Sequence, residues 1–340
     1  MDKSYPILSC DNIVKLYPVR RGLFSKVVGN KRIVDDVSLE VEEGKTIALV
    51  GESGCGKSVL LRIISDIEKP TTGTVRFHGC PLDELYPEDR DEMKKSVQMI
   101  FQDTLSSLHP RFTIQESIEE PLKLSGVSDP AERMAIIKKT FDLIGLDTDF
   151  LTRYPHQLSG GQRQRAVIAR ALVVNPKLLL ADEPISALDV SLQAQIINLL
   201  MDLQSELNLS ILLVAHDLAV VRQIADEILI MYLGHIVERA KSKDIYSDAR
   251  HPYTKVLLKA APSIKKGIND EGFSLDLKVG DTPSPENPPK GCPFCTSCGI
   301  VVWAEVSQHQ PCCSGFHQLP CEAGTVLIGE MPLFPGNSLF

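Results

Sequence analysis

The chain has 340 residues, of which 43% are hydrophobic and 24% are charged, and its formal net charge is −8. This length fits one large domain or two modest ones, and the composition is ordinary for a soluble globular protein. The acidic balance weighs against a sequence-independent nucleic-acid binder, which needs a basic face to neutralise phosphates. No stretch approaches the roughly eighteen uninterrupted apolar residues of a membrane span, and no signal peptide is evident, so we expect a cytosolic location.

Short β-type alternations are expected in residues 1–46, interrupted by a basic stretch at 20–32 that indicates a loop insertion. Residues 47–50 form a short apolar run typical of a buried strand, and a glycine-rich turn and a helix follow. From about 112 to 175, apolar residues recur at three- and four-residue spacing, which predicts helices. Over 178–234, strand and helix patterns alternate, which implies a parallel sheet covered by helices.

Residues 51–58 match G-x-x-x-x-G-K-[ST] between an expected strand and an expected helix, which is the context that this motif needs. Glycines there let successive backbone N–H groups face an anion, and the helix N-terminus adds its dipole. Lys57 is expected to reach the β- and γ-phosphates of ATP, and the Ser58 hydroxyl to ligate Mg²⁺. The alternative is a chance match, a glycine turn with a surface lysine. The nucleotide-binding residues predicted here are Gly51, Ser53, Gly54, Cys55, Gly56, Lys57, Ser58 and Val59. We call residues 51–58 the phosphate loop.

Two carboxylates, Asp182 and Glu183, follow the apolar run 178–181. At the carboxyl end of a parallel strand, side chains face the ligand crevice. Asp182 would hold Mg²⁺ through water, and Glu183 would act as the general base that polarises the attacking water. Taken alone, the pair is equally compatible with ordinary surface acids at a strand end. The phosphate loop in the same chain favours the catalytic interpretation.

The segment 158–165, with the letters LSGGQRQR, places a serine hydroxyl and glycine N–H groups at a helix start, where they can form a second anion-binding nest. In series with the two motifs above, it resembles the signature motif of the ATP-binding subunits of ABC transporters. This resemblance implies that the γ-phosphate of an ATP molecule held by the opposite subunit is bound by Ser159, Gly160, Gly161 and Gln162.

The remaining elements of that family appear in the expected order, and the resemblance covers about residues 5–260. It implies that Gln102 senses Mg²⁺ and the attacking water, that Asp189 lies at the dimer seam, and that His216 contacts the γ-phosphate. Tyr17 is expected to stack on adenine, with an apolar core role as the alternative. Gln157 stands where relatives usually carry Glu, and we expect this difference to bear on coupling to membrane subunits rather than on ATP binding.

Several segments resemble the oligopeptide/dipeptide importer branch: 17–23, 106–111, 153–156, 251–254 and the proline-rich stretch 280–291. The basic insertion is more like the second of the two ATPases that such importers carry. The resemblance implies a second, homologous ABC ATPase as partner in a heterodimer, two transmembrane permease subunits and an extracellular or periplasmic solute-binding protein. The chain would then be peripheral at the cytoplasmic face of the membrane.

Six of the nine cysteines follow residue 291, and in a reducing cytosol such a cluster more often indicates a metal site than disulfides. Cys292, Cys295 and Cys298 have the C-x₂-C-x₂-C spacing of ferredoxin-type loops.

In the family that the chain resembles, some C-terminal tails hold a [4Fe-4S] cluster on four cysteines. Cys292, Cys298 and Cys321 fall at three of those positions and Glu305 occupies the other, so Cys312 or Cys313 would replace the missing ligand. A Zn²⁺ site on four thiolates is also compatible with the sequence, and so are reduced cysteines without a metal.

The expected fold is α/β: a P-loop NTPase of ABC type, with a RecA-like parallel-sheet core, an antiparallel β subdomain and an inserted helical subdomain. The ABC domain would span 1–260, with the helical subdomain at about 103–176, and a small Cys-rich extension would span 261–340. Two subunits would sandwich two ATP molecules head to tail. The rival function is a soluble ABC ATPase acting on nucleic acid or ribosomes. The single set of motifs weighs against it, and we expect no nucleic-acid partner.

Overall fold

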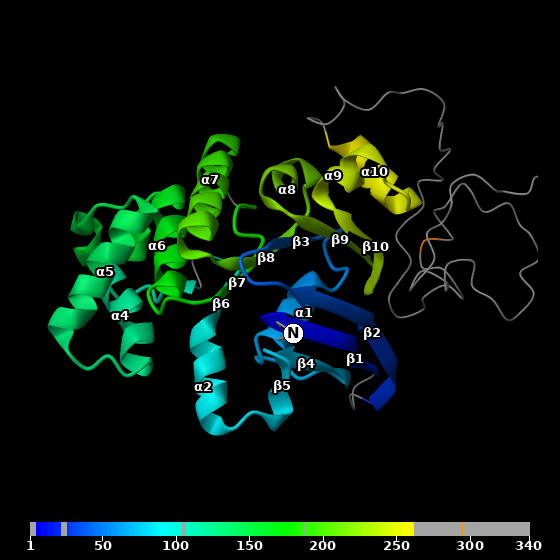
Figure 1. The fold of residues 1–340 in the computed structure, drawn as a ribbon, viewed down its shortest axis with the longest axis horizontal. Coiled ribbons are helices and arrows are strands. Elements are labelled where there is room, and N and C mark those ends of the chain that lie inside the picture. The colour runs from blue at the N-terminus through cyan, green and yellow to red at the C-terminus, as the bar shows by residue number, and fades with distance from the viewer. Residues whose placement is uncertain (1–4, 22–25, 104–106, 187, 262–293, 295–340) are drawn as a thin grey trace, which may run out of the picture.

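The computed structural model describes residues 5–21, 26–103, 107–186, 188–261 and Phe294 (Figure 1). The larger of its two sheets has the strand order β10-β9-β3-β8-β7-β6. Its strands are β3 (Thr46–Val50), β6 (Val97–Ile100), β7 (Leu178–Asp182), β8 (Ser210–Ala215), β9 (Glu227–Tyr232) and β10 (His235–Lys241). The strands from β6 to β9 run parallel, and β10 pairs antiparallel with β9. The predicted parallel sheet is therefore present, with one antiparallel edge strand.

Burial explains why these short segments are strands. Every residue of β3, β7 and β8 is buried, so both faces of the sheet are covered. A strand covered on both faces must be a continuous apolar run, and Leu178–Ala181 and Ile211–Ala215 are such runs. The polar residues needed for chemistry are then confined to the ends of these strands.

The smaller sheet is antiparallel, with the order β2-β1-β4-β5. Its strands are β1 (Leu8–Arg21), β2 (Lys26–Val41), β4 (Thr72–Phe77) and β5 (Cys80–Pro81).

The prediction of a loop insertion at 20–32 is wrong for most of that stretch. Tyr17 pairs with Lys31 and Arg20 pairs with Val27, so β1 and β2 extend into the basic segment as an antiparallel ribbon. The backbone hydrogen bonds of the ladder form there although the side chains stay exposed, with Val27 at 52% and Val28 at 55%. An exposed ribbon needs no alternation of apolar and polar residues, and the sequence pattern therefore gave no strand signal.

Helices surround the larger sheet. They are α1 (Lys57–Ile64), α2 (Pro87–Ser96), α4 (Ile114–Leu124), α5 (Pro130–Ile144), α6 (Gly160–Leu172), α7 (Val190–Leu207), α8 (Leu218–Ile224), α9 (Ser242–Ser247) and α10 (Pro252–Ala260), with 3₁₀ turns η1 (Leu82–Glu84), η2 (Thr148–Thr152) and η3 (Pro155–Gln157). In Figure 1, α4, α5 and α6 gather on one side of the molecule and α9 and α10 on the other. The predicted helical stretch from about 112 to 175 is confirmed by α4 to α6.

The helical group has a core of its own that continues onto one face of the larger sheet. Ile137, Phe141 and Ile144 share one face of α5 and are fully buried in it. The opposite face of the sheet packs on α1 and on the smaller sheet. Helix α6 belongs to the first core and α1 to the second, so the two helices lie in different parts of the molecule.

None of the helices described in the structure combines the length and the apolar character needed to cross a bilayer. The last described helix ends at Ala260, and the expected extension 261–340 lies outside the described residues except for Ala261 and Phe294. The domain boundary at 260 and the bounds of the helical subdomain therefore stay predictions.

Replacing Phe141 with alanine tests the core of the helical group. We expect Phe141→Ala to lower the free energy of unfolding by about 3–5 kcal/mol, because the ring is fully buried and its removal leaves a cavity. Guanidinium unfolding followed by circular dichroism measures the change. Lys138→Ala, on the exposed face of the same helix, is the control. Equal midpoints for the two variants would contradict the packing described here.

Candidate nucleotide site

The phosphate loop joins the end of β3 to the start of α1, as the motif predicts. Gly54 and Gly56 have φ values of 83° and 112°, in the left-handed region that favours glycine. A Cβ built on Gly56 would lie 2.3 Å from the carbonyl oxygen of Ile33, so no other residue fits there without displacing β2. This backbone curl turns consecutive N–H groups to one side, which is the arrangement that binds phosphate. Val59 lies half-buried in the first turn of α1.

Lys57 is the buried cation of the loop, with only 4% of its surface exposed. Its Nζ donates to the carbonyl oxygens of Gly51 at 2.7 Å and Glu52 at 2.8 Å. Both acceptors are neutral, so the positive charge is hydrogen-bonded but not neutralised by them. An anion in the loop would add negative charge that these carbonyl groups do not carry. Cys55 is buried beside Lys57, and burial raises the pKa of its thiol.

Residues outside the phosphate loop form hydrogen bonds with its backbone. The Gly234 N–H donates to the Cys55 carbonyl at 2.9 Å, and the Glu52 N–H donates to the Tyr253 hydroxyl at 3.1 Å. Sequence reasoning missed both contacts. The segment 251–254 was recognised only as a mark of the importer branch, and nothing in its spacing connects it with the phosphate loop.

The Ser58 hydroxyl donates to Asp182 Oδ1 at 3.1 Å, across the gap between α1 and the end of β7. Asp182 is 5% exposed, and burial raises the pKa of its carboxyl group, while the Ser58 hydrogen bond opposes the rise. A hydroxyl and a carboxylate oxygen side by side next to the phosphate loop fit Mg²⁺, which takes one or two protein oxygens and completes its shell with water and phosphate. The predicted Mg²⁺ residues Ser58 and Asp182 are therefore adjacent.

The three predicted catalytic residues meet at one oxygen. Gln102 Nε2 donates to Glu183 Oε2 at 3.1 Å, and His216 Nδ1 lies 3.5 Å from the same oxygen. They come from the ends of β6, β7 and β8, which are neighbours in the sheet. The Glu183 backbone has φ 45°, in the left-handed region, and its N–H donates to Val214 O at 3.1 Å. Non-glycine residues held in this uncommon conformation cluster at functional sites.

A small cavity of about 40 Å³ lies against Glu183, His216 and Asp217. That volume holds at least one water molecule, and the cavity has the polar partners that a bound water needs. Glu183 lines the cavity, so a water molecule there would contact this residue.

The signature segment 158–165 starts α6 in the helical group. Ser159 is its exposed N-cap: the hydroxyl accepts from Gln162 N at 3.3 Å, and Gln162 Oε1 accepts from Ser159 N at 2.9 Å. Gly161 packs against Leu192 so closely that an added Cβ would lie 3.0 Å from that side chain. Asp189 caps α7 by accepting from Leu192 N at 2.9 Å, and backbone hydrogen bonds lower the pKa of its carboxyl group. Within one chain, α6 and α1 lie apart (Figure 1).

Tyr17 lies on β1, and its hydroxyl donates to Glu68, which also pairs with Lys15 at 2.9 Å. Burial, and then Glu68, raises the pKa of Tyr17 to about 12. The ring is half-buried. The stacking of Tyr17 on adenine stays a prediction.

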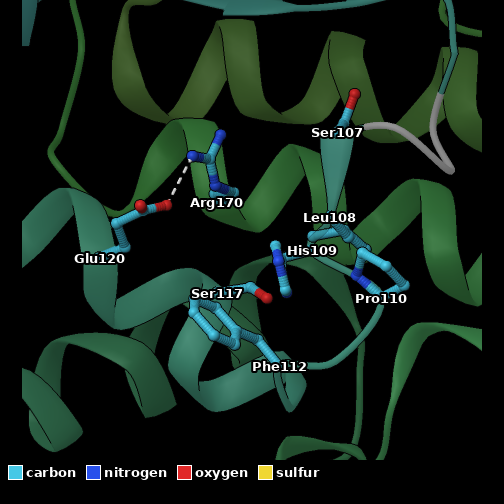
Figure 2. A pocket seen from close by; sticks show the side chains of 8 residues that line it. All are labelled: Ser107, Leu108, His109, Pro110, Phe112, Ser117, Glu120 and Arg170. Atoms are coloured by element: carbon cyan, nitrogen blue, oxygen red, sulfur yellow. Dashed lines mark hydrogen bonds and ion pairs between the residues drawn. The ribbon is translucent and has the colours of Figure 1, made fainter.

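A separate hollow of about 530 Å³ lies on the helical group, where the chain continues from Gln102 toward α4. Figure 2 shows the Glu120–Arg170 ion pair, with a 2.9 Å separation, beside the imidazole of His109 and the ring of Phe112. The remaining lining residues are Ser107, Leu108, Pro110 and Ser117. Residues 107–110, which belong to the segment recognised from the sequence as a mark of the branch, supply much of this wall.

The predicted metal ligands Cys292, Cys295, Cys298, Cys312, Cys313 and Cys321 all lie outside the described residues. Among the residues that the structure does describe, no group of three or more His, Cys, Asp or Glu side chains could hold a metal ion. The cysteines described are free, Cys10 and Cys55 buried and Cys80 exposed.

Gly56→Ala tests the phosphate loop. We expect the variant to lose measurable affinity for MgATP, since the added Cβ meets the Ile33 carbonyl and the positive φ is strained for alanine. Isothermal titration calorimetry measures the affinity, and circular dichroism verifies folding. The matched control is Gly29→Ala, where a Cβ meets nothing within 4 Å. Unchanged binding by Gly56→Ala would remove this loop from the nucleotide site.

Comparisons with known proteins agree on the family. The model of the ABC transporter family matches residues 34–186, and that of the oligopeptide/dipeptide transporter C-terminal region matches residues 237–302. The chain is 45% identical to the dipeptide transport ATP-binding protein DppF of Haemophilus influenzae, over 86% of this chain and 88% of that protein. It is also 45% identical to the oligopeptide transport ATP-binding protein AppF of Bacillus subtilis, over 87% and 90% respectively.

Among solved structures, a dimeric post-hydrolysis state of the ATP-binding cassette MJ0796, bound to ADP and Pi, superposes with a TM-score of 0.61 at 31% identity. The match covers 69% of this chain and 98% of that one. The motif order, the strand-end geometry and these similarities lead to one conclusion: the chain belongs to the ABC transporter family, in the branch that carries the oligopeptide/dipeptide transporter C-terminal region.

Proposed function

We propose that this chain is the ATP-binding and ATP-hydrolysing subunit that energises an ABC importer of oligopeptides, dipeptides or similar solutes. The names of DppF and AppF support the peptide class, and the match to the transporter C-terminal region supports the same branch. The single observation that carries the enzymatic part is the meeting of Gln102, Glu183 and His216 at one carboxylate oxygen beside the phosphate loop.

In this proposal, ATP lies with its phosphates over the N–H groups of the phosphate loop and against the Lys57 ammonium, and Tyr17 stacks on adenine. Glu183 Oε2 accepts the proton of the water that attacks the γ-phosphate. Gln102 and His216 orient that water and the carboxylate by hydrogen bonding. Ser58 and Asp182, together with Gln102, would hold Mg²⁺, which neutralises charge on the phosphates when it is bound. Positioning and electrostatic stabilisation account for most of the rate.

The signature segment completes the site of a neighbouring subunit. Ser159 is exposed and Gly160 half-buried at the start of a helix, so the Ser159 hydroxyl and the Gly160 N–H are accessible to an anion from outside the chain. The related cassette MJ0796 is described as dimeric with ADP and Pi. Two subunits arranged head to tail would close over two ATP molecules, because the phosphates bridge the loop of one chain and the signature of the other.

The partners that follow from this function are two permease subunits, a solute-binding protein and a second ABC ATPase, which we propose is a paralogue in a heterodimer. The chain would sit peripherally on the cytoplasmic face of the membrane. The rival function, an ATPase that acts on nucleic acid or ribosomes, has less support because the net charge is −8 and the relatives DppF and AppF are named as transport proteins.

Replacing Glu183 with glutamine separates binding from hydrolysis. We expect Glu183→Gln to bind MgATP normally and to hydrolyse it ~10²–10⁴ times more slowly, because the amide cannot accept the proton. The bound nucleotide should then hold the subunits together, which size-exclusion chromatography with and without ATP would show. Glu206→Gln, an exposed glutamate on α7, is the charge-matched control. Wild-type turnover by Glu183→Gln would refute the assignment of the base.

The cysteine-rich extension needs a separate test. If four of its thiolates hold an iron–sulfur cluster or Zn²⁺, anaerobically purified protein should contain iron with acid-labile sulfide and absorb in the visible, or contain stoichiometric zinc. Metal and sulfide analysis together with a visible spectrum distinguishes an iron–sulfur cluster from bound Zn²⁺. A colourless, metal-free sample would refute the metal site and leave the ATPase proposal intact.

A further inference from the structure

A buried tyrosine contacts the phosphate loop from the C-terminal part of the fold. Tyr253 lies in the first turn of α10 and is 1% exposed. Its hydroxyl accepts the backbone N–H of Glu52, the second residue of the loop, at 3.1 Å. Burial raises the pKa of Tyr253, so the hydroxyl stays neutral at physiological pH. No step of the proposed hydrolysis uses this residue.

The start of α10 is held in place by β10. The two carboxylate oxygens of Glu238 accept the N–H groups of Arg250 at 2.7 Å and His251 at 3.0 Å. His251 then caps the helix, because its Nδ1 accepts from Tyr253 N at 3.1 Å. The backbone that carries Tyr253 is therefore fixed by three hydrogen bonds that do not involve the phosphate loop.

Aromatic packing fixes the ring as well. Tyr253 lies 4.6 Å from the Tyr232 ring and 5.6 Å from the Phe294 ring, between centroids. Phe294 is 4% exposed and also packs edge-on against Tyr232 at 5.3 Å. In the sequence, Phe294 lies 34 residues beyond the end of α10, so one member of this aromatic cluster is distant in the chain from the other two.

Strand β9 contacts both the phosphate loop and the aromatic cluster, which consists of Tyr232, Tyr253 and Phe294. Tyr232 follows Met231, and a Cβ built on Gly51 would lie 2.2 Å from the Met231 carbonyl oxygen. The beginning of the loop is thus contacted by β9 at Gly51 and by α10 at Glu52. A small displacement of Tyr253 would therefore shift the phosphate loop as well, because tightly packed groups transmit strain.

We propose that Tyr253 is a positioning residue for ATP binding: its hydroxyl holds the Glu52 end of the phosphate loop, and Phe294 holds Tyr253. The inference rests on the proposed function, since it takes residues 51–58 to bind ATP. The hydrogen bond from the Glu52 N–H to Tyr253 restricts rotation of that peptide plane. The N–H groups of the following loop residues therefore stay directed at the phosphates. Without the hydroxyl, the loop must be ordered when ATP binds, and that ordering weakens affinity. Both aromatic residues lie in the region matched to the oligopeptide/dipeptide transporter C-terminal model.

Tyr253→Phe in the full chain tests the hydroxyl, because it keeps the ring and its packing. We expect the dissociation constant for Mg²⁺ and adenylyl imidodiphosphate, measured by calorimetry, to rise about three- to tenfold, the effect of losing one buried hydrogen bond. The KM for ATP should rise by the same factor while kcat changes less than twofold. Tyr246→Phe is the matched control: Tyr246 is a half-buried tyrosine of α9 whose hydroxyl donates to the Leu218 carbonyl and not to the phosphate loop.

A double-mutant cycle tests the role of Phe294. Phe294→Ala should weaken nucleotide affinity in the wild-type chain and add nothing in the Tyr253→Phe chain, because residues that act through one contact are not additive. Phe294→Leu, which keeps an apolar side chain, should retain most of the affinity and guards against a folding defect in the alanine variant.

Any one of three results would overturn the positioning role of Tyr253 while leaving the proposed function intact. They are wild-type nucleotide affinity in Tyr253→Phe, an equal loss of affinity in Tyr246→Phe, and effects of Tyr253→Phe and Phe294→Ala that multiply in the double variant. Lys57→Ala, which removes the loop's cation, should bind no nucleotide in the same assay. A wild-type chain that also binds none would overturn the proposed function together with this inference.

Discussion

The register of the parallel strands is the constraint on which the arrangement of the proposed catalytic residues depends. Ile100 pairs with Ala181, and Asp182 pairs with Val214, so β6, β7 and β8 end at nearly the same level. The residues that follow these strands are therefore brought together at one edge of the sheet. Gln102, Glu183 and His216 are far apart in the chain, yet they meet at a single carboxylate oxygen for this reason. A shift of one strand by one residue would separate them.

The phosphate loop depends on contacts of a different kind. Its curl needs glycine where β2 comes within van der Waals distance, and its backbone is hydrogen-bonded to Gly234 and to Tyr253. Tyr253, in the region matched to the oligopeptide/dipeptide transporter C-terminal model, thus contacts Glu52, in the region matched to the ABC transporter model. The signature segment and the phosphate loop belong to different cores of one chain, which is compatible with the two-subunit site proposed above.

Much of the fold could be predicted from the sequence because the signals were strong and local. Continuous apolar runs identified β3, β7 and β8, since both faces of these strands are covered, and the periodicity of the helical group identified its buried face. The basic ribbon was missed because its side chains are exposed, so its strands rest on backbone pairing alone. Tyr253 was missed as a neighbour of the phosphate loop because contacts between residues about 200 positions apart leave no periodic pattern.

The sequence by itself determined the family, the order of the motifs and the chemical type of each residue at the nucleotide site. Those properties reside in short segments whose glycines, hydroxyls and carboxylates are ambiguous one by one but match a single family when they occur together in this order. Only the tertiary structure decided which of these side chains touch: the shared oxygen of Glu183, the Ser58–Asp182 hydrogen bond and the aromatic cluster under Glu52. The reason is physical, because such contacts arise from the packing of strands and helices distant in the chain, and packing depends on the whole core at once.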